Sequence, residues 1–341
     1  MGVTRRFVLF LFLLAAGAAR ADEPATPAPP PTLEQASDAV LAAVKAKDDA
    51  TLSTLAAKDD PDPWLVADEL IRRGELDAAD AFARAAPRKD VEQLPPYVAS
   101  RRGKPDDPAR RKRLADLNAA LAANQAVVAL EVASVSVSAE DVTGIRIAGG
   151  RAIALRELER WKESAAAFLA AAGAAETAGW LSRASWSLRR ACVTARPGGD
   201  VAGFIAAAER ICDVDAVRGR RADVAAMLVD TGVFLSDTVH DHPKALSYFE
   251  RGLKEARAVG HRKWAANALA NMAVAHDMLG DRRKALERFE ESLVLREELG
   301  DPQGVAHTLG EIGNTHEKLG DIARALEFLS LIHISEPTRR S

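Results

Sequence analysis

The tripeptide Leu-Gly-Asp recurs every twenty residues and constrains the fold of this chain more than any other feature. It occupies Leu279–Asp281, Leu299–Asp301 and Leu319–Asp321, and weaker forms stand at Val239–Asp241 and Val259–His261. Glycine ends a helix because it enters the left-handed conformation without steric cost, and aspartate can cap the next helix. Each period therefore predicts one helix followed by one turn.

The apolar residues follow two alternating patterns, which doubles the repeat to forty residues. One pattern consists of Ala245, Leu246 and Phe249, and returns as Ala285, Leu286 and Phe289. The other consists of Leu269, Met272, Ala273 and His276, and returns as Leu309, Ile312, Gly313 and His316. These spacings place each set on one helical face. Small residues opposite large ones predict antiparallel helix pairs that pack closely.

At these positions the chain resembles the tetratricopeptide repeat family, in its forty-residue form with Leu-Gly-Asp turns. The matching residues are Ala273, Gly280, Ala285 and Ser292 at small positions, and Leu269, Met272 and Phe289 at large ones. The resemblance is strongest from Arg221 to Phe328, although His276 and His316 stand where the family usually has tyrosine. It implies an all-α superhelical solenoid of antiparallel helix pairs, whose first helices line a concave groove.

The first 21 residues have the pattern of a signal peptide. A basic start precedes an apolar run, and Ala19-Arg20-Ala21 is typical of a cleavage site. An uncleaved anchor is the alternative, but the run is shorter than the roughly 20 residues that a bilayer span needs. We therefore expect export to the periplasm or the extracellular space, with no membrane span after cleavage.

The rest of the chain divides by composition and by the strength of the repeat. We expect a Pro-rich tether at 22–32, helical hairpins at 33–99, a basic linker at 100–113, degenerate repeats at 114–220, well-formed repeats at 221–328 and a tail at 329–341. A patch for an anionic partner is the alternative for the basic linker. It lacks interleaved aromatic residues, and Asp106 and Asp107 dilute its charge, so a solvated linker is preferred. The net charge of −3 also argues against nucleic acid.

The tail breaks the repeat after Phe328. Residues Leu329 to Arg339 resemble the in-frame translation of a transposon-end adapter used to prepare DNA sequencing libraries. We therefore expect these residues not to be native, and the last pair to lack the side chains that would cover Leu309 and Ile312. A genuine strand-like tail is the alternative.

The residue pattern indicates no catalytic constellation, no cofactor and no metal site. His240-Asp241-His242 occupies a turn position, so we interpret these residues as turn residues rather than metal ligands. Cys192 and Cys212 are expected to be buried free thiols, because their positions on neighbouring helices differ by about 10 Å along the axis. The visible chain is therefore predicted not to be an enzyme.

What remains is a surface that binds a protein or a peptide. The resemblance places these residues in the groove: Asp230, Phe234, Asp237, Asn267, Asn271, Asp277, His307, Glu311, Asn314 and Glu317. The set leans acidic, which favours a partner segment with basic or amide groups over a free carboxylate tail. We expect an exported scaffold. The alternative is the regulatory region of a larger protein, such as those of similar type that carry a caspase-like CHAT peptidase domain.

Overall fold

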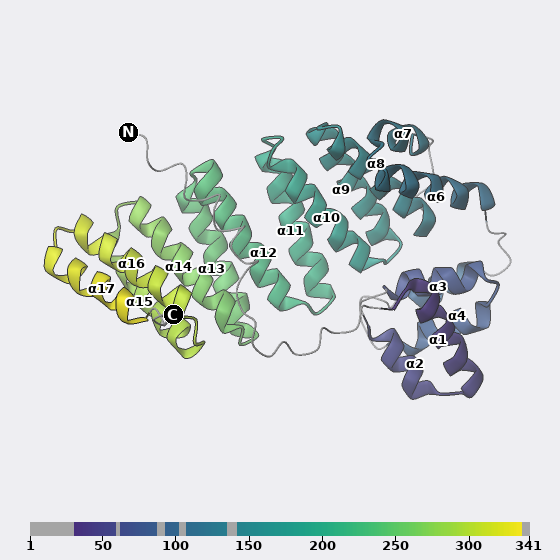
Figure 1. Cartoon of the computed structure of the whole chain (residues 1–341), viewed down its shortest axis with the longest axis horizontal. Coiled ribbons are helices and arrows are strands. Elements are labelled where there is room, and N and C mark those ends of the chain that lie inside the picture. The colour runs from purple at the N-terminus through teal and green to yellow at the C-terminus, as the bar shows by residue number, and fades with distance from the viewer. Residues whose placement is uncertain (1–30, 59–61, 87–92, 102–106, 135–141, 336–341) are drawn as a thin grey trace, which may run out of the picture.

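The computed structural model describes residues 31–58, 62–86, 93–101, 107–134 and 142–335, and every element within them is a helix. This confirms the predicted all-α class. Five helices form an N-terminal cluster: α1 (Leu33–Ala46), α2 (Asp49–Ala56), α3 (Pro63–Arg72), α4 (Leu76–Ala85) and α5 (Leu94–Arg101). Figure 1 shows this cluster beside one end of an elongated stack of helix pairs.

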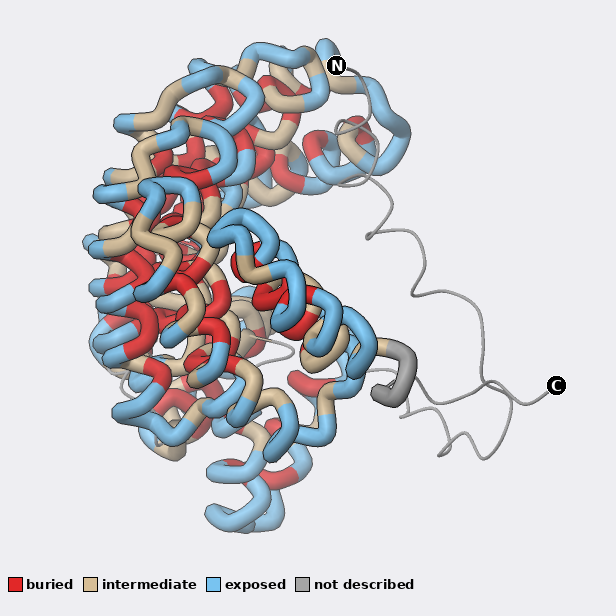
Figure 2. The backbone as a smooth tube through the Cα atoms, turned by 90° about the vertical axis from the view of Figure 1, so that its left-hand side faces the viewer, coloured by how far each residue is buried: buried red, intermediate tan, exposed pale blue. Residues whose placement is uncertain are grey.

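The stack begins with α6 (Pro108–Ala122) and α7 (Ala126–Val132). It continues through five helix pairs: α8 (Val142–Glu157) with α9 (Trp161–Thr177), α10 (Leu181–Ala195) with α11 (Val201–Val217), α12 (Arg221–Phe234) with α13 (His242–Ala258), α14 (Arg262–Met278) with α15 (Arg282–Glu298), and α16 (Pro302–Lys318) with α17 (Ile322–Ser335). We call the earlier member of each pair the first helix and the later member the second helix. Figure 2 shows the buried residues inside the stack, between the helices.

A residue in the left-handed conformation follows each helix from α8 to α16, and it recurs about every twenty residues. The positions are Glu159, Gly179, Gly199, Gly219, His240, Gly260, Gly280, Gly300 and Gly320. The amide after each turn bonds to a carbonyl near the helix end, as in Asp281 N to His276 O at 2.9 Å. Glu159 and His240 adopt this conformation although neither is a glycine. The backbone therefore has two equivalent turns at positions where the glycine of the motif is absent.

Aspartate caps follow most of the turns that carry one, as the motif predicts. The carboxylates of Asp200, Asp241, Asp301 and Asp321 accept a hydrogen bond from the amide three residues later, at 2.8, 3.1, 2.9 and 3.2 Å. Asp281 is the exception, because its carboxylate binds Nζ of Lys284 at 2.7 Å instead. The turn role expected for His240 and Asp241 is confirmed.

Close packing of small residues against aromatic rings joins the helices within each pair. Phe249 and Phe289 are each 1% exposed. A Cβ added at Gly232 of α12 would lie 2.4 Å from the ring of Phe249 on α13. The buried Ser292 hydroxyl donates to the Ala266 carbonyl at 2.9 Å across the next pair. Larger residues at the small positions would therefore force the paired helices apart.

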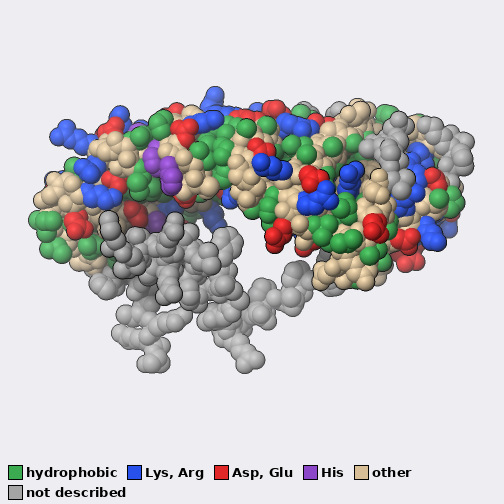
Figure 3. All heavy atoms as spheres, turned by 90° about the horizontal axis from the view of Figure 1, so that it is seen from above, with side chains coloured by type: hydrophobic (Ala, Val, Ile, Leu, Met, Phe, Trp, Pro, Cys, Tyr) green, Lys and Arg blue, Asp and Glu red, His purple; other side chains and the backbone are tan. Residues whose placement is uncertain are grey.

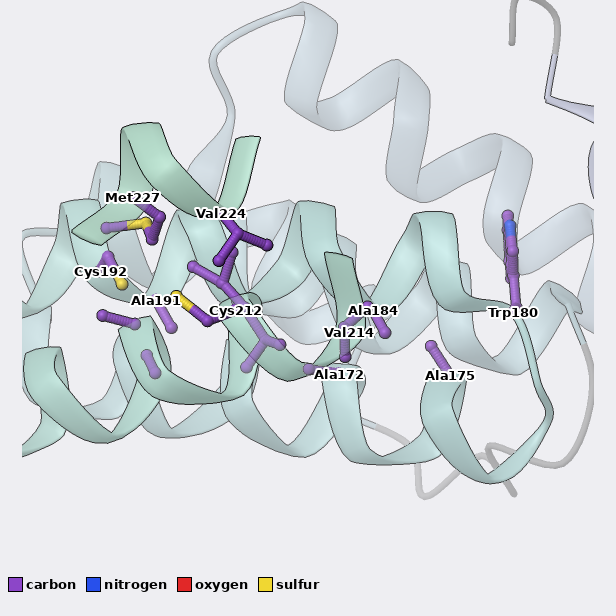
Figure 4. Packing of buried hydrophobic residues seen from close by; sticks show 14 of the residues in the cluster. Ala172, Ala175, Trp180, Ala184, Ala191, Cys192, Cys212, Val214, Val224 and Met227 are labelled. Atoms are coloured by element: carbon purple, nitrogen blue, oxygen red, sulfur yellow. The ribbon is translucent and has the colours of Figure 1, made fainter. Parts of the chain in front are cut away.

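Both cysteines are free and buried, as the sequence predicts. Figure 4 shows Cys192 and Cys212 among Ala191, Val224 and Met227, in the core formed by α10, α11 and α12. Burial raises the pKa of each thiol to about 12. The sulfur atoms therefore serve as small apolar groups of the core.

The basic segment at 100–113 differs from the expected linker. Asp107 caps α6 by accepting the amides of Ala109 at 3.0 Å and Arg110 at 3.2 Å. Pro108 suits the first turn because its missing N–H is not needed there, so most of the basic residues lie within a helix. Residues 102–106 lie outside the described residues, as do the predicted signal peptide and most of the predicted tether.

The expected break after Phe328 is absent, because α17 continues to Ser335. Leu329 lies against Gly313, where a Cβ would be 3.0 Å from its Cγ, and the Phe328 ring stacks on His316 at 5.5 Å between ring centres. Leu309 and Ile312 are 5% and 0% exposed, so the expectation that they lack cover was wrong. Residues 328, 329 and 332 recur at helical spacing, which gives α17 an apolar face.

Gly280→Ala should lower the free energy of unfolding by about 1 kcal/mol, because φ at Gly280 is +84° and alanine pays a steric cost there. Glu159→Gly is the matched control. It should leave stability nearly unchanged, because relief of the strained conformation offsets the greater freedom of the unfolded chain. Urea denaturation measures both, and equal losses in the two variants would contradict the role assigned to the turns.

Neither thiol should react with iodoacetamide in the native protein near pH 8, because the thiolate is the nucleophile and is almost absent there. Peptide mass spectrometry after timed labelling measures the modification of Cys192 and Cys212. The same protein in guanidinium chloride is the control and should be labelled at both positions. Rapid native labelling would show that α10 and α11 do not bury the two side chains.

Candidate functional site

Equivalent turns define a common register for the five first helices. The carbonyls that accept the amide following each turn belong to Leu155, Ala195, Leu235, His276 and His316. Nine residues before these lie Arg146, Trp186, Ala226, Asn267 and His307. Five residues before them lie Gly150, Arg190, Asp230, Asn271 and Glu311. We call the side of the first helices that carries these two sets the groove face.

Most of the sequence-predicted groove residues lie on this face. Asp230, Asn267, Asn271, His307 and Glu311 belong to the two sets. Asn314 and Glu317 are exposed farther along α16, and Asp237 is exposed in the π-helical turn Leu235–Val239 that follows α12. The structure therefore gives eight of the ten candidates access to solvent, on the first helices or directly after them.

Two candidates do not fit this surface. Phe234 is 4% exposed and packs on Phe204 with ring centres 4.1 Å apart, so it belongs to the core. The Asp277 side chain is 9% exposed and pairs with Lys318 and, at 3.8 Å, with Arg282. Helical spacing could not show that Phe234 and Asp277 differ from the exposed candidates. Both are covered by side chains of a neighbouring repeat, and spacing along one helix does not report such contacts.

Sequence reasoning missed the residues of the degenerate repeats that share the same register. These are Arg146 on α8, and Trp186 and Arg190 on α10, together with Arg183 one turn before Trp186. The Leu-Gly-Asp motif is absent there. The glycines at 179, 199 and 219 keep its twenty-residue spacing and would have extended the register upstream.

The guanidinium of Arg183 lies between α8 and the Trp186 ring. A Cβ at Gly149 would be 2.5 Å from Nη2 of Arg183, so the missing side chain makes room for it. Cζ of Arg183 lies 4.0 Å from the ring centre of Trp186, and Cζ of Arg190 lies 5.3 Å from it. Burial, with the charges of Arg146 and Arg190, lowers the pKa of Arg183 to about 10. Positive charge is thus concentrated at this end of the groove face.

The N-terminal cluster packs beside these arginines. The carboxylate of Asp62 accepts hydrogen bonds from Trp64 N at 2.9 Å, Trp180 Nε1 at 3.1 Å and the Ser182 hydroxyl. The Trp64 and Trp180 rings stack with centres 6.0 Å apart. Burial raises the pKa of Asp62 in spite of these donors. These contacts tie α3 to the start of α10.

A cavity of about 310 Å³ lies where the N-terminal cluster meets α6 and α8. Charged side chains of both signs line it, including Asp68, Glu69 and Arg146. The Tyr97 hydroxyl donates to Asp68 at 2.9 Å. Arg146 therefore stands between this cavity and the groove face.

Asp230 reverses the charge one repeat after Arg190. Its side chain is exposed, yet surrounding protein raises its pKa, while Arg196 and Arg189 lower it. Arg189 is already paired with the buried Asp215 at 2.6 Å.

Several charges of the second helices, in contrast, are paired across neighbouring repeats. Glu176 on α9 pairs with Arg210 on α11 at 2.9 Å. Glu209 on α11 binds both terminal nitrogens of Arg251 on α13, at 2.6 and 2.7 Å. Arg257 on α13 pairs with Glu291 on α15 at 3.1 Å. Figure 3 shows charged side chains of both signs interspersed on the surface of the curved stack.

Comparison with known proteins agrees with this architecture. Residues 223–298 match the tetratricopeptide repeat family model. Residues 223–298 are therefore assigned to tetratricopeptide repeats. The apo form of RapI has a TM-score of 0.54 at 12% identity, over 89% of this chain and 76% of RapI. No curated protein matches the chain significantly.

Two other solved structures are similar to this chain with lower TM-scores. A signal transduction ATPase with a tetratricopeptide repeat sensor, from Pyrococcus horikoshii, has a TM-score of 0.49 at 14% identity, over 90% of this chain and 47% of its own. A Rap protein complexed with competence and sporulation factor has a TM-score of 0.41 at 17% identity, over 88% of this chain and 76% of its own.

Two further features concern the described residues of the chain. None of the described helices has the length and apolar character of a membrane span. No group of three or more His, Cys, Asp or Glu side chains within these residues is arranged to hold a metal ion.

Asp62→Ala should loosen the N-terminal cluster, because the Trp180 indole and the Ser182 hydroxyl lose their acceptor. We expect a loss of roughly 1–3 kcal/mol in the stability of that cluster. Hydrogen exchange should rise in α3 and stay constant in α14 and α15. Asp38→Ala is the control, since this exposed carboxylate pairs only with Arg73 at the surface. Unchanged protection of α3 in Asp62→Ala would contradict the prediction.

Proposed function

We propose that this protein is an exported scaffold that binds an extended segment of a partner protein along the groove face. One observation carries the proposal. Charged side chains in one register of successive first helices, such as Arg190, Asp230 and Glu311, have no ion pair within the described residues. Several charged side chains of the second helices, in contrast, pair with one another across neighbouring repeats.

Charges left unpaired on one side of a repeat array favour a ligand that supplies the missing partners. Equivalent positions return with every helix pair, so the polar groups form a row rather than a closed pocket. An extended segment matches such a row, since its own side chains repeat at regular intervals. The tetratricopeptide repeat architecture supports the same reading, because stacked repeats present long concave surfaces to partners.

The end of the groove face at α14 and α16 favours basic or amide groups on the partner. Glu311 and Glu317 supply carboxylates on α16, and Asn271 on α14 and Asn314 on α16 supply amides. No residue of α16 balances the two glutamates by an ion pair. Carboxylates that are partly exposed in this way bind Lys and Arg side chains well.

Export rests on residues 1–21, whose basic start, apolar run and Ala19-Arg20-Ala21 site are typical of a signal peptide. The protein would then meet its partner in the periplasm or outside the cell. Free, unreactive thiols in the core are compatible with an oxidising compartment, since they offer no thiolate at the surface.

A peptide-display selection tests the scaffold function. The wild-type protein should enrich twelve-residue peptides from a random library. The basic peptides among them should bind a variant that carries Glu311→Lys and Glu317→Lys at least about tenfold more weakly than they bind the wild type. This change in affinity corresponds to the loss of one charge-assisted contact. Fluorescence anisotropy with the enriched peptides measures the change.

The matched control carries Glu290→Lys and Glu297→Lys on α15, a second helix. Both glutamates are exposed, and the charge change equals that of the test variant. The control should bind every enriched peptide as the wild type does. If no peptide is enriched, or if the control variant weakens peptide binding as much as the test variant does, the groove face is not the binding surface.

A further inference from the structure

We infer that Arg183 and Arg190, which both approach the Trp186 ring, form together with Arg146 of α8 a docking site for acidic side chains of the partner segment. The site lies at the α8 and α10 end of the groove face. This inference rests on the proposed function and adds the chemistry of one end of the partner. Two observations carry it: the fixed geometry of Arg183, and the lack of a carboxylate for any of the three arginines.

The structure holds Arg183 in one orientation. Its guanidinium fills the space left by Gly149 on one side and stacks on Trp186 at 4.0 Å on the other. Its Nε is buried and has no hydrogen-bond partner within the described residues, so only the partly exposed remainder of the side chain can meet a ligand. An arginine that is stacked in place loses little further conformational freedom when it binds a ligand. Such a group is prepared to receive an acceptor.

The neighbouring carboxylates are already engaged. Asp62 acts on Arg183 only through its charge, because its hydrogen bonds come from Trp64, Trp180 and Ser182. Asp68 acts on Arg146 in the same way and accepts from Tyr97. Within the described residues no ion pair joins Arg146, Arg183 or Arg190 to an acid. Repulsion among the three cations therefore remains for a bound anion to relieve.

A carboxylate fits this arrangement better than a larger anion. The planar fork of a guanidinium binds the two oxygens of a carboxylate with two parallel hydrogen bonds. Arg183 and Arg190 approach the same Trp186 ring, so the fork of each lies beside an apolar plane that also covers the carbon atoms of an Asp or Glu side chain.

The groove face continues from this site to a group of opposite sign. Arg190 on α10 and Asp230 on α12 occupy the same register, one repeat apart. A partner segment that carries an acidic residue and, farther along, a basic residue can pair with both: its acidic residue with Arg190 and its basic residue with Asp230. The two signs would also orient the segment along the groove, because the reversed segment would place like charges together.

This inference corrects the preference drawn from the sequence. The sequence argument preferred basic or amide groups on the partner because the groove residues of the regular repeats lean acidic. The structure adds arginines in the same register on α8 and α10, where the repeat motif is weak. Basic or amide groups remain the preference only for the opposite end of the groove face.

The test repeats the peptide-display selection with wild-type protein and with Arg190→Gln. Arg190 is exposed, so its replacement leaves the core intact. Wild-type protein should enrich peptides with Asp or Glu at a shared position, and Arg190→Gln should lose that preference. For the best acidic peptide, Arg190→Gln and Arg183→Gln should each weaken binding at least about tenfold. Thermal unfolding of each variant checks that it folds.

A peptide with Gln in place of its acidic residue completes the experiment. It should bind wild type and Arg190→Gln with equal affinity, because the coupling between the two charges is then absent. Arg151→Gln is the matched control, since Arg151 is exposed on α8 outside the register of the groove face. It should bind the acidic peptide as the wild type does.

The outcomes separate this inference from the proposed function. Enrichment of peptides without an acidic preference, or equal affinity of Arg190→Gln for the acidic peptide, overturns the inference and leaves the scaffold function standing. Enrichment of no peptide overturns both. Stronger binding of the matching phosphoserine peptide than of the glutamate peptide, with competition by inorganic phosphate, would assign the arginines to a phosphate group and overturn the carboxylate.

Discussion

The structure depends on the left-handed residue that ends each helix about every twenty residues. It reverses the chain so that consecutive helices run antiparallel, and it brings small side chains of one helix against aromatic rings of the next. A single pair buries only part of its apolar surface, so each pair relies on its neighbours. Glu159 and His240 adopt the same conformation without glycine. The stacked neighbours therefore supply enough packing energy to offset the strain of these two turns.

Stacking also decides which charges are neutralised. The second helices bring glutamate and arginine of neighbouring repeats together, and the bidentate pair of Glu209 with Arg251 holds the pKa of Glu209 below its usual range. The groove face of the first helices presents Arg190 at one end and Asp230 and Glu311 farther along, and within the described residues none of these three has an ion pair. The two sides of one array therefore differ in their electrostatics. This difference in charge pairing between the two sides, rather than a pocket, is the reason why we propose the groove face as a binding surface.

The N-terminal cluster adds a boundary to the basic end of this surface. The Asp62 carboxylate accepts hydrogen bonds from Trp64, Trp180 and Ser182, and these bonds hold α3 against the start of α10. The same hydrogen bonds prevent Asp62 from neutralising Arg183. Docking of the cluster and the unpaired state of the arginine are thus two results of one arrangement. A carboxylate from a partner would complete it.

The sequence alone determined the helix pairs, the forty-residue period, the turn residues and the two free thiols, because these follow from local conformation and from spacing along one chain. It also indicated most of the groove positions in the regular repeats. Only the tertiary structure decided that Phe234 belongs to the core, that Leu309 and Ile312 are covered by α17, and that Arg183 rests on Gly149. Each of these features depends on which side chains of separate helices come into contact. A periodic sequence pattern does not predict such contacts where the repeat motif is weak.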